Sequence, residues 1–303
     1  MTAPGSRRLQ ADLALALCTV FWGATFVIVK GALTNASVFV FMALRFSLAA
    51  LIMAVIHRRA LRAITRDEFW AGVQIGALMF GGYVFQTIGL LTSTPTNAAF
   101  ITGAGVVLVP ILLAVFWRRR SNAWLWAGAL AAFAGLYFLT IPPAGLKGLV
   151  VGDVLCLGCA VAFAFHIIAV GFYSRHHSVG ALSFLQVATT AVFSAVAVPV
   201  LSLTRLQSAW VHWNAALLGA VLITAVLATA VAFSIQVWGQ RYTTATHAAI
   251  LFALEPVFAA VTSFLVIGER WGARSISGAV LILLGIVLAE LKGPGPASPD
   301  SLA

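Results

Sequence analysis

The sequence predicts an all-α integral membrane protein with ten transmembrane helices, arranged as two inverted-topology five-helix repeats around a central cavity. Its composition, ten long apolar runs and a match between the two halves predict this fold class. Hydrophobic residues make up 62% of the 303 residues and charged residues only 9%, whereas soluble domains carry about 25% charged residues. Because a water-soluble fold could not bury so much apolar surface, we expect the chain to lie in a lipid bilayer.

Ten continuous apolar runs define the expected helices, separated by short polar or Pro/Gly-containing gaps. A hydrocarbon core of ~30 Å requires roughly 20 apolar residues per helix, and a β-barrel would instead show alternating segments of about ten residues. The runs are Leu13 to Lys30, Val38 to Ile56, Phe69 to Leu91, Pro95 to Trp117, Trp124 to Ile141, Leu149 to Phe172, Val179 to Leu203, Ala215 to Trp238, Thr244 to Ile267 and Gly272 to Leu291.

The basic residues indicate how the chain is oriented. If the N-terminus is cytoplasmic, twelve Lys and Arg residues fall in cytoplasmic segments and five in outer segments. The positive-inside rule therefore predicts that both termini are cytoplasmic. The net charge of +10 does not indicate nucleic-acid binding, because the basic residues lie in short gaps and form no stripe.

The two halves of the chain resemble each other. A shift of 150 residues places Gln86 over Gln236 and Gly89 over Gly239 without a gap, and the match continues to Gly135 over Gly285. A shift of 141 residues aligns the first helix of each half, with Asp12 over Asp153 and Cys18 over Cys159. We therefore expect repeats at 11–142 and 149–291, followed by a disordered cytoplasmic tail at 292–303.

An odd number of helices in each repeat has a mechanistic consequence. The second repeat must enter the bilayer from the opposite side, which gives the inverted topology found in many secondary transporters. Two equivalent halves of opposite direction can expose a shared site alternately to each side of the membrane. The sequence thus favours a carrier over a permanently open channel, because its spans contain only scattered polar residues.

The repeat also pairs Gln86 with Gln236 and Asn97 with His247. Inverted topology sends the two pairs to opposite faces, so Gln86 and Asn97 are candidates for an outer gate, and Gln236 and His247 for an inner gate. The alternative interpretation is that all four are interfacial polar residues that cap helix ends.

Nearer the bilayer midplane, the sequence offers polar and aromatic candidates for the wall of a cavity. Such groups suit an amphipathic ligand, because aromatic faces attract an ammonium group and hydroxyl or amide groups orient its polar end. The alternative for each is packing or hydrogen bonding between helices. The candidates are Trp22, Thr25, Tyr83, Thr102 and His166.

Arg45 and Glu255 lie about halfway along their runs, where a charge costs several kcal/mol unless it is paired or hydrated. One hypothesis is that they pair with each other. Another is that Glu255 faces the cavity and binds protons or a substrate ammonium group. Either residue is thus a candidate for charge coupling.

Proline and glycine predict irregular and closely packed positions. Pro256 and Pro110 each remove a backbone hydrogen bond and should kink helices 9 and 4. Paired glycines should let helix backbones approach closely. The pairs include Gly128 with Gly135, and Gly278 with Gly285.

Several short motifs resemble those of the drug/metabolite transporter superfamily, and of its EamA-type transporters in particular. They are Phe21-Trp22-Gly23, Ala43-Leu44-Arg45-Phe46, Thr96-Asn97-Ala98-Ala99-Phe100, and Glu255-Pro256 followed by Gly268-Glu269-Arg270. The resemblance implies that helices 1, 3, 4, 6, 8 and 9 surround the cavity, with helices 5 and 10 outside. The first half departs from the pattern, having Trp117-Arg118-Arg119-Arg120 where Gly-Glu-Arg is usual.

Within that superfamily the chain is most similar to the YddG-like group, which exports aromatic and other neutral amino acids. This resemblance implies a multi-pass protein of the bacterial inner membrane whose partners are amino acids and the lipid bilayer. Efflux of drugs or other metabolites is the alternative. An intramembrane enzyme is not expected, since no HExxH or GxSxG motif occurs. No cofactor, metal or nucleic-acid partner is expected.

Overall fold

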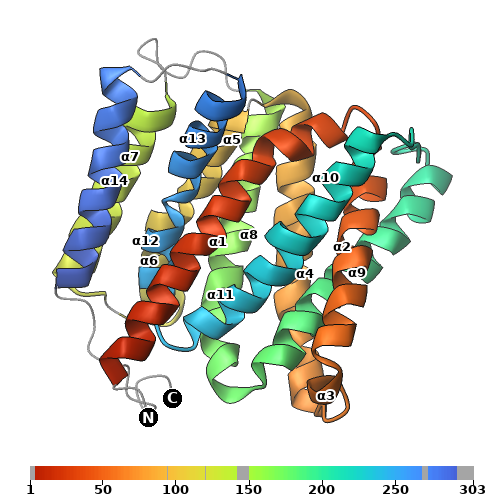
Figure 1. Cartoon of the computed structure of the whole chain (residues 1–303). Helices are drawn as coiled ribbons and strands as arrows, with labels where there is room; N and C mark the ends of the chain where they lie inside the picture. The colour runs from red at the N-terminus through yellow and green to blue at the C-terminus, as the bar shows by residue number, and fades with distance from the viewer. Residues whose placement is uncertain (1–3, 94, 120, 142–149, 268–271, 292–303) are drawn as a thin grey trace.

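A computed structural model of the chain describes residues 4–93, 95–119, 121–141, 150–267 and 272–291 (Figure 1). Within these ranges, eight helices are long and apolar enough to cross a membrane, and two shorter apolar helices, Ala123–Leu139 and Ala273–Ala289, accompany them. These helices correspond to the ten expected spans, which confirms the all-α fold class. The expected tail at 292–303 lies outside the described residues.

Several of the ten spans consist of more than one helix. The first half contains α1 (Pro4–Ala32), α2 (Val38–Ile56), the short α3 (Arg58–Leu61), α4 (Arg66–Thr92), α5 (Pro95–Gly103), α6 (Gly105–Phe116) and α7 (Ala123–Thr140). The second half contains α8 (Val151–His176), α9 (Val179–Leu203), α10 (Ala215–Ala225), the π-helix η1 (Val226–Val231), α11 (Ala232–Gln240), α12 (Ala245–Phe252), α13 (Glu255–Ile267) and α14 (Ala273–Leu291).

Polar side chains mark the beginnings of several spans. Thr65 and Glu68 form a reciprocal capping box at the start of α4. Asn122 and Thr244 accept hydrogen bonds from the third backbone N–H of α7 and α12, respectively. Such caps satisfy backbone donors that have no partner within the helix. The short polar gaps in the sequence thus end one span and begin the next.

The packing of α7 against α14 shows the inverted repeat directly (Figure 1). The sequence match pairs Gly128 with Gly278 and Gly135 with Gly285, but in space Gly128 lies against Gly285 and Gly135 against Gly278. Helices that are equivalent in sequence therefore run antiparallel and contact each other through the same surface. This arrangement requires a pseudo-two-fold axis between them.

A second pair of contacts follows the same symmetry. Gly89 of α4 lies against Cys156 of α8, and Gly239 of α11 lies against Leu15 of α1. The shift of 150 residues aligns Gly89 with Gly239, and the shift of 141 residues aligns Cys156 with Leu15. The second contact is therefore the repeat equivalent of the first. The repeat is therefore expressed in helix packing as well as in sequence.

Two spans are interrupted at equivalent positions. The fourth span breaks at Ala104, between α5 and α6, and the ninth breaks at Ala253 and Leu254, between α12 and α13. At each break a backbone N–H bonds three residues back, from Ala104 to Ile101 at 3.1 Å and from Ala253 to Ile250 at 3.2 Å. The interruption of the ninth span directly precedes Pro256, as expected. The interruption of the fourth span does not lie at Pro110, which is inside α6, but six residues before it.

We expect Gly278→Ala to destabilise the protein by about 2 kcal/mol, because overpacking a close contact typically costs 1–3 kcal/mol. A Cβ atom at Gly278 would lie 2.6 Å from the Gly135 carbonyl oxygen and closer still to the Leu139 nitrogen. Gly219→Ala is the matched control, since a Cβ atom there meets nothing within 4 Å. Thermal unfolding in detergent measures both variants, and equal midpoints would contradict the close α7–α14 packing.

Candidate functional site

A cavity of about 90 Å³ lies in the centre of the bundle, between the two repeats. Its lining residues come from α1, α2, α4, α5, α6, α8, α11, α12 and α13, and from the break before α13. Helices α7 and α14 contribute no described residue to it, in agreement with the expectation that helices 5 and 10 lie outside. The volume holds only a few water molecules, so the walls must separate before a larger solute can enter.

Both interrupted spans reach this cavity at their breaks. Gly103 and Gly105 line it from the fourth span, and Ala253 and Glu255 line it from the ninth. The first backbone N–H groups of a half-helix lack intrahelical partners and carry partial positive charge. Interrupted helices of this kind commonly form the substrate sites of secondary transporters.

Arg45 enters the cavity from α2 and is held by neutral partners. Its Nε donates to the Thr229 hydroxyl at 2.9 Å, and its Nη2 donates to the Tyr83 hydroxyl at 3.2 Å. The guanidinium carbon also lies 4.8 Å from the centroid of the Tyr83 ring and 5.1 Å from that of Phe46. These contacts fix the side chain while Nη1 keeps its donors available, since no described residue bonds to it.

The π-helix η1 supplies two of the groups that shape the site. Trp22 Nε1 donates to the carbonyl of Ala228 at 3.0 Å, and Thr229 both receives the Arg45 bond and donates to the carbonyl of Thr224 at 2.8 Å. A π-bulge shifts the hydrogen-bond register of a helix and often marks a functional site. Here it orients both Trp22 and Arg45 toward the cavity.

Glu255 reaches the same cavity from the first residue of α13. The structure does not bring it into an ion pair with Arg45, whose bonds go to Thr229 and Tyr83. Among the described residues, no side chain or backbone donor bonds to the Glu255 carboxylate. The cavity therefore contains one cation and one carboxylate that face it separately.

Aromatic rings form much of the remaining wall. Trp22 lies 5.4 Å from Phe233 and 5.2 Å from Phe252, centroid to centroid, and Tyr83 lies 5.3 Å from Phe163 in an edge-on contact. All five rings line the cavity. Offset and edge-on contacts between rings are favourable, and their exposed faces attract cations.

The polar side chains predicted to line the cavity differ in how many of their hydrogen-bonding atoms already have a partner. Gln86 has no hydrogen-bond partner among the described residues, and Gln236 donates to Gln240 at 3.0 Å but leaves its own Oε1 unpaired. His166 Nε2 lies 2.9 Å from Gln186 Oε1. Thr25 donates to the Trp22 carbonyl at 2.9 Å, and Thr102 lies 3.7 Å from the Cys159 sulfur. These five side chains line the cavity.

The structure places the four gate candidates in different surroundings. Gln86 and Gln236 both line the central cavity. His247 is completely buried outside that lining, with its Nε2 3.5 Å from Asp12 Oδ1. It faces α1 because of its position in the first turn of α12. Asn97 lies in α5, and its side chain is outside the described part of the chain.

Three lining residues, and Thr229 which bonds to the lining residue Arg45, carry no signal in the sequence. Phe163 reads as ordinary packing, and Phe233 and Phe252 cannot be told from lipid-facing phenylalanines in uniformly apolar helices. Thr229 acquires its role from η1, which contains neither glycine nor proline. Only the three-dimensional arrangement identifies these four residues.

Known proteins support a transport function for this architecture. The model of the EamA-like transporter family matches the chain twice, over residues 9–141 and 150–291. A protein from Archaeoglobus fulgidus named as an uncharacterized transporter is 38% identical over 96% of this chain and 89% of its own length. The threonine/homoserine exporter RhtA from Escherichia coli is 24% identical over 83% of this chain and 79% of its own length.

A solved crystal structure has the same fold, with a TM-score of 0.75, 18% identity, and coverage of 93% of this chain and 96% of the other. The family and the relatives' names point to a transporter and not to an enzyme. The two family matches together cover nearly the whole chain. The chain belongs to the EamA-like transporter family.

Proposed function

We propose that this protein is a secondary transporter that exports small amphipathic metabolites, specifically aromatic and other neutral amino acids. The observation that carries the proposal is the separate placement of Arg45 and Glu255 in one aromatic cavity. A zwitterion presents a carboxylate and an ammonium group at a short distance from each other. One guanidinium and one carboxylate that are not paired with each other can bind both ends at once.

The remaining wall suits an apolar side chain. The rings of Trp22, Phe233 and Phe252 offer contact area, and Gln86 offers amide groups without a bond to any described residue. Ligand sites typically combine mostly apolar walls with a few polar groups that fix orientation. Multiply charged anions fit poorly, because Arg45 is the only basic residue among the described residues in the lining apart from His166.

Alternating access is the transport mechanism that the repeat symmetry supports. The break at Ala104 and the break at Ala253 occupy equivalent positions in oppositely directed repeats. Exchanging the conformations of two such halves would convert a cavity open to one side into a cavity open to the other. We propose repeats at 11–142 and 149–291, an inner-membrane location, and both termini in the cytoplasm.

The name of one relative agrees with this substrate class. RhtA is a threonine/homoserine exporter, and both of its named substrates are neutral amino acids. The Arg45 and Glu255 arrangement recognises the groups that all such amino acids share, while the cavity wall would select among their side chains.

Counterflow in proteoliposomes tests the proposal. Vesicles loaded with unlabelled phenylalanine should accumulate labelled phenylalanine, leucine or threonine transiently, and the initial rate should saturate with concentration. Empty liposomes and vesicles loaded with glucose are the controls. Background uptake for a complete panel of neutral amino acids would refute the assignment.

A further inference from the structure

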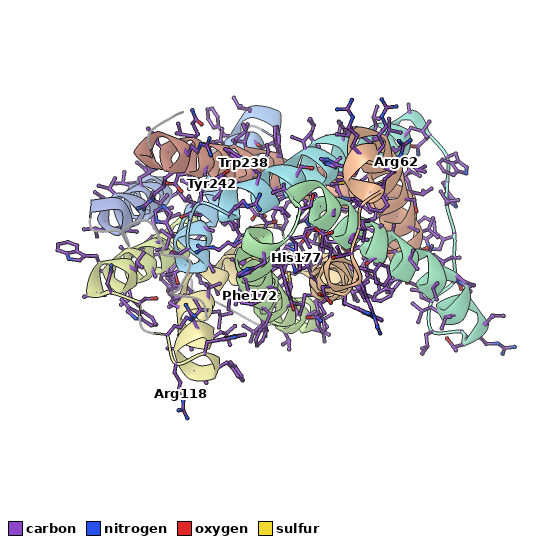
Figure 2. The ribbon with its side chains drawn as sticks, turned by 90° about the horizontal axis from the view of Figure 1, so that it is seen from below. Arg62, Arg118, Phe172, His177, Trp238 and Tyr242 are labelled. Atoms are coloured by element: carbon purple, nitrogen blue, oxygen red, sulfur yellow. The ribbon has the colours of Figure 1, made fainter. Side chains whose placement is uncertain are left out.

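A short chain of hydrogen bonds ends in the wall of the central cavity. Gln236 Nε2 donates to Gln240 Oε1 at 3.0 Å, and Gln240 Nε2 donates to the Ile167 carbonyl at 2.9 Å. Both glutamines belong to α11, and Ile167 belongs to α8. Figure 2 views the face at which α11 ends and labels Trp238 and Tyr242 near that end. Gln240 lies between these two residues in the sequence, and its side chain is completely buried, so the bonds run inside the bundle.

The direction of these bonds fixes the orientation of the Gln236 amide. A backbone carbonyl can only accept a hydrogen bond, so Gln240 must present its amide nitrogen to Ile167. Gln240 Oε1 then faces Gln236 and can only accept, so Gln236 must present its own amide nitrogen. The remaining polar atom, Gln236 Oε1, is buried and has no hydrogen-bond partner among the described residues. Gln236 therefore contributes an acceptor whose orientation is held by two further groups.

A buried acceptor of this kind discriminates between ligands. Gln236 lines the central cavity but is only 1% exposed, so its Oε1 is shielded from bulk solvent. A buried polar atom that stays unpaired is destabilising, and no described side chain of the cavity lining donates to this one. A ligand that offers a hydrogen-bond donor removes the cost, whereas a ligand that is apolar at this point does not. Sites built around such a bond reject analogues that lack the donor.

The position of Gln236 indicates which part of a substrate it meets. Phe233 and Gln236 are three residues apart, so they lie on the same side of α11, and Phe233 lies 5.4 Å from Trp22 between ring centroids. Thr229, which bonds to Arg45, precedes Gln236 by seven residues in the same span, a separation of ~10 Å at 1.5 Å per residue. A ligand whose carboxylate binds Arg45 would therefore meet Gln236 with the far end of a long side chain.

The first repeat has no equivalent of this fixed acceptor. The shift of 150 residues aligns Gln86 with Gln236 but Leu90 with Gln240. Leucine has no polar atom, so nothing one turn further along α4 fixes the Gln86 amide. Gln86 can therefore rotate to act as a donor or as an acceptor, whereas the bonds of Gln236 leave its oxygen toward the ligand. The two glutamines are equivalent in the sequence but differ in what they can select.

We propose that Gln236, oriented by Gln240, selects substrates whose side chain ends in a hydrogen-bond donor, so that tyrosine and tryptophan bind more tightly than phenylalanine. The inference deepens the proposed function and rests on it, because it places the charged groups of an amino acid at Arg45 and Glu255. The phenol hydroxyl of tyrosine and the indole N–H of tryptophan are donors on otherwise apolar aromatic side chains. Gln236 contacts the substrate, and Gln240 is a positioning residue.

Competition by matched aromatic amino acids tests the inference. In counterflow of labelled tyrosine, we measure the inhibition constants of phenylalanine, tyrosine, O-methyltyrosine, tryptophan and 1-methyltryptophan. Methylation removes the donor from tyrosine and from tryptophan but keeps the ring. The wild type should bind tyrosine about tenfold more tightly than phenylalanine or O-methyltyrosine, and tryptophan about tenfold more tightly than 1-methyltryptophan.

Two substitutions separate the acceptor from the residue that orients it. Gln236→Leu should abolish the preference for tyrosine over both phenylalanine and O-methyltyrosine, because it removes the acceptor at similar size. Gln240→Leu frees the Gln236 amide, which can then rotate and donate to the methoxy oxygen. This variant should therefore lose the preference over O-methyltyrosine but keep the preference over phenylalanine, a split that a merely structural role of Gln240 would not produce.

Controls for folding and for location use the same kind of substitution. Replacing both partners of a buried hydrogen bond by apolar groups is often nearly neutral for stability, so Q236L/Q240L is a second variant that leaves neither amide unpaired. It should behave like Gln236→Leu. Gln86→Leu makes the same change at the repeat-equivalent position of the same cavity, and it should keep the wild-type preference for tyrosine over O-methyltyrosine.

Equal inhibition constants of the wild type for tyrosine, O-methyltyrosine and phenylalanine would overturn the inference while exchange of tyrosine still supported the proposed function. Weak binding of O-methyltyrosine that persists in Gln236→Leu and in Q236L/Q240L would reveal a steric clash of the methyl group and also overturn it. An equal loss of preference in Gln86→Leu would do the same. Background exchange of tyrosine, tryptophan and phenylalanine by the wild type would refute the proposed function, and the inference with it.

Discussion

Glu255→Gln is expected to lower phenylalanine exchange about 100-fold, since a charge-assisted hydrogen bond contributes about 1.5–3 kcal/mol. The Glu255 carboxylate has no bonding partner among the described residues and faces a cavity with a single guanidinium. In the proposed site, its negative charge binds the ammonium group of the substrate. Glutamine preserves the size of the side chain but removes that charge.

The effect should reside in recognition of the ammonium group. We expect 3-phenylpropionate, which lacks this group, to compete poorly with phenylalanine for the wild type. For Glu255→Gln, the two compounds should compete equally well. Asp67→Asn is the matched control, because Asp67 lies in the first turn of α4 and outside the cavity lining. Full exchange of phenylalanine by Glu255→Gln, with Asp67→Asn also unaffected, would exclude a role for the carboxylate.

Arg45→Gln is expected to cause a comparable loss, about 100-fold, because the proposed function assigns the substrate carboxylate to this guanidinium, which also bonds to Tyr83 and Thr229. Arg45→Lys should restore little of the exchange. Lysine lacks the planar group that bonds two hydroxyls and stacks on an aromatic ring at once. Initial counterflow rates for the three proteins measure the effect.

Arg274→Gln is the matched control for this arginine. Arg274 lies 5.2 Å from the Tyr137 ring centroid and 5.0 Å from that of Phe138, and it donates to the Ile141 carbonyl at 3.2 Å. Its surroundings thus resemble those of Arg45, but it lies outside the cavity lining. If Arg45→Gln and Arg274→Gln reduced exchange equally, the loss would reflect folding and the role of Arg45 in binding would be refuted.

Much of the architecture was predictable because it depends on patterns that survive in a single sequence. Apolar run length determines how many helices can span the bilayer. The match of residues 86–135 to residues 236–285, together with five helices in each half, predicts halves of opposite direction. The paired glycines at 128 and 135 predicted a close helix contact, and the structure shows which partner each one meets. Pro256 correctly predicted an interruption just before it.

The site was less predictable, because helix rotation decides which side chains face a cavity. His247 and Ala249 are only two residues apart in α12, yet Ala249 lines the cavity and His247 faces Asp12. The π-helix rotates Thr229 toward Arg45, although it contains no glycine or proline that would have predicted an irregular helix. Arg175 indicates only membrane topology in the sequence, whereas tertiary packing places it with Arg119 in the lining of a cavity apart from the central one.

Equilibrium binding of three ligands to the purified protein tests the central claim most directly. Phenylalanine, phenylalaninamide and 3-phenylpropionate share one aromatic ring and differ in their charged groups. Wild type should bind phenylalanine at least about tenfold more tightly than either analogue. Arg45→Gln should lose the preference for phenylalanine over phenylalaninamide but keep the preference over 3-phenylpropionate. Glu255→Gln should lose the preference over 3-phenylpropionate but keep the preference over phenylalaninamide. Equal affinity of the wild type for all three ligands would contradict zwitterion recognition by Arg45 and Glu255.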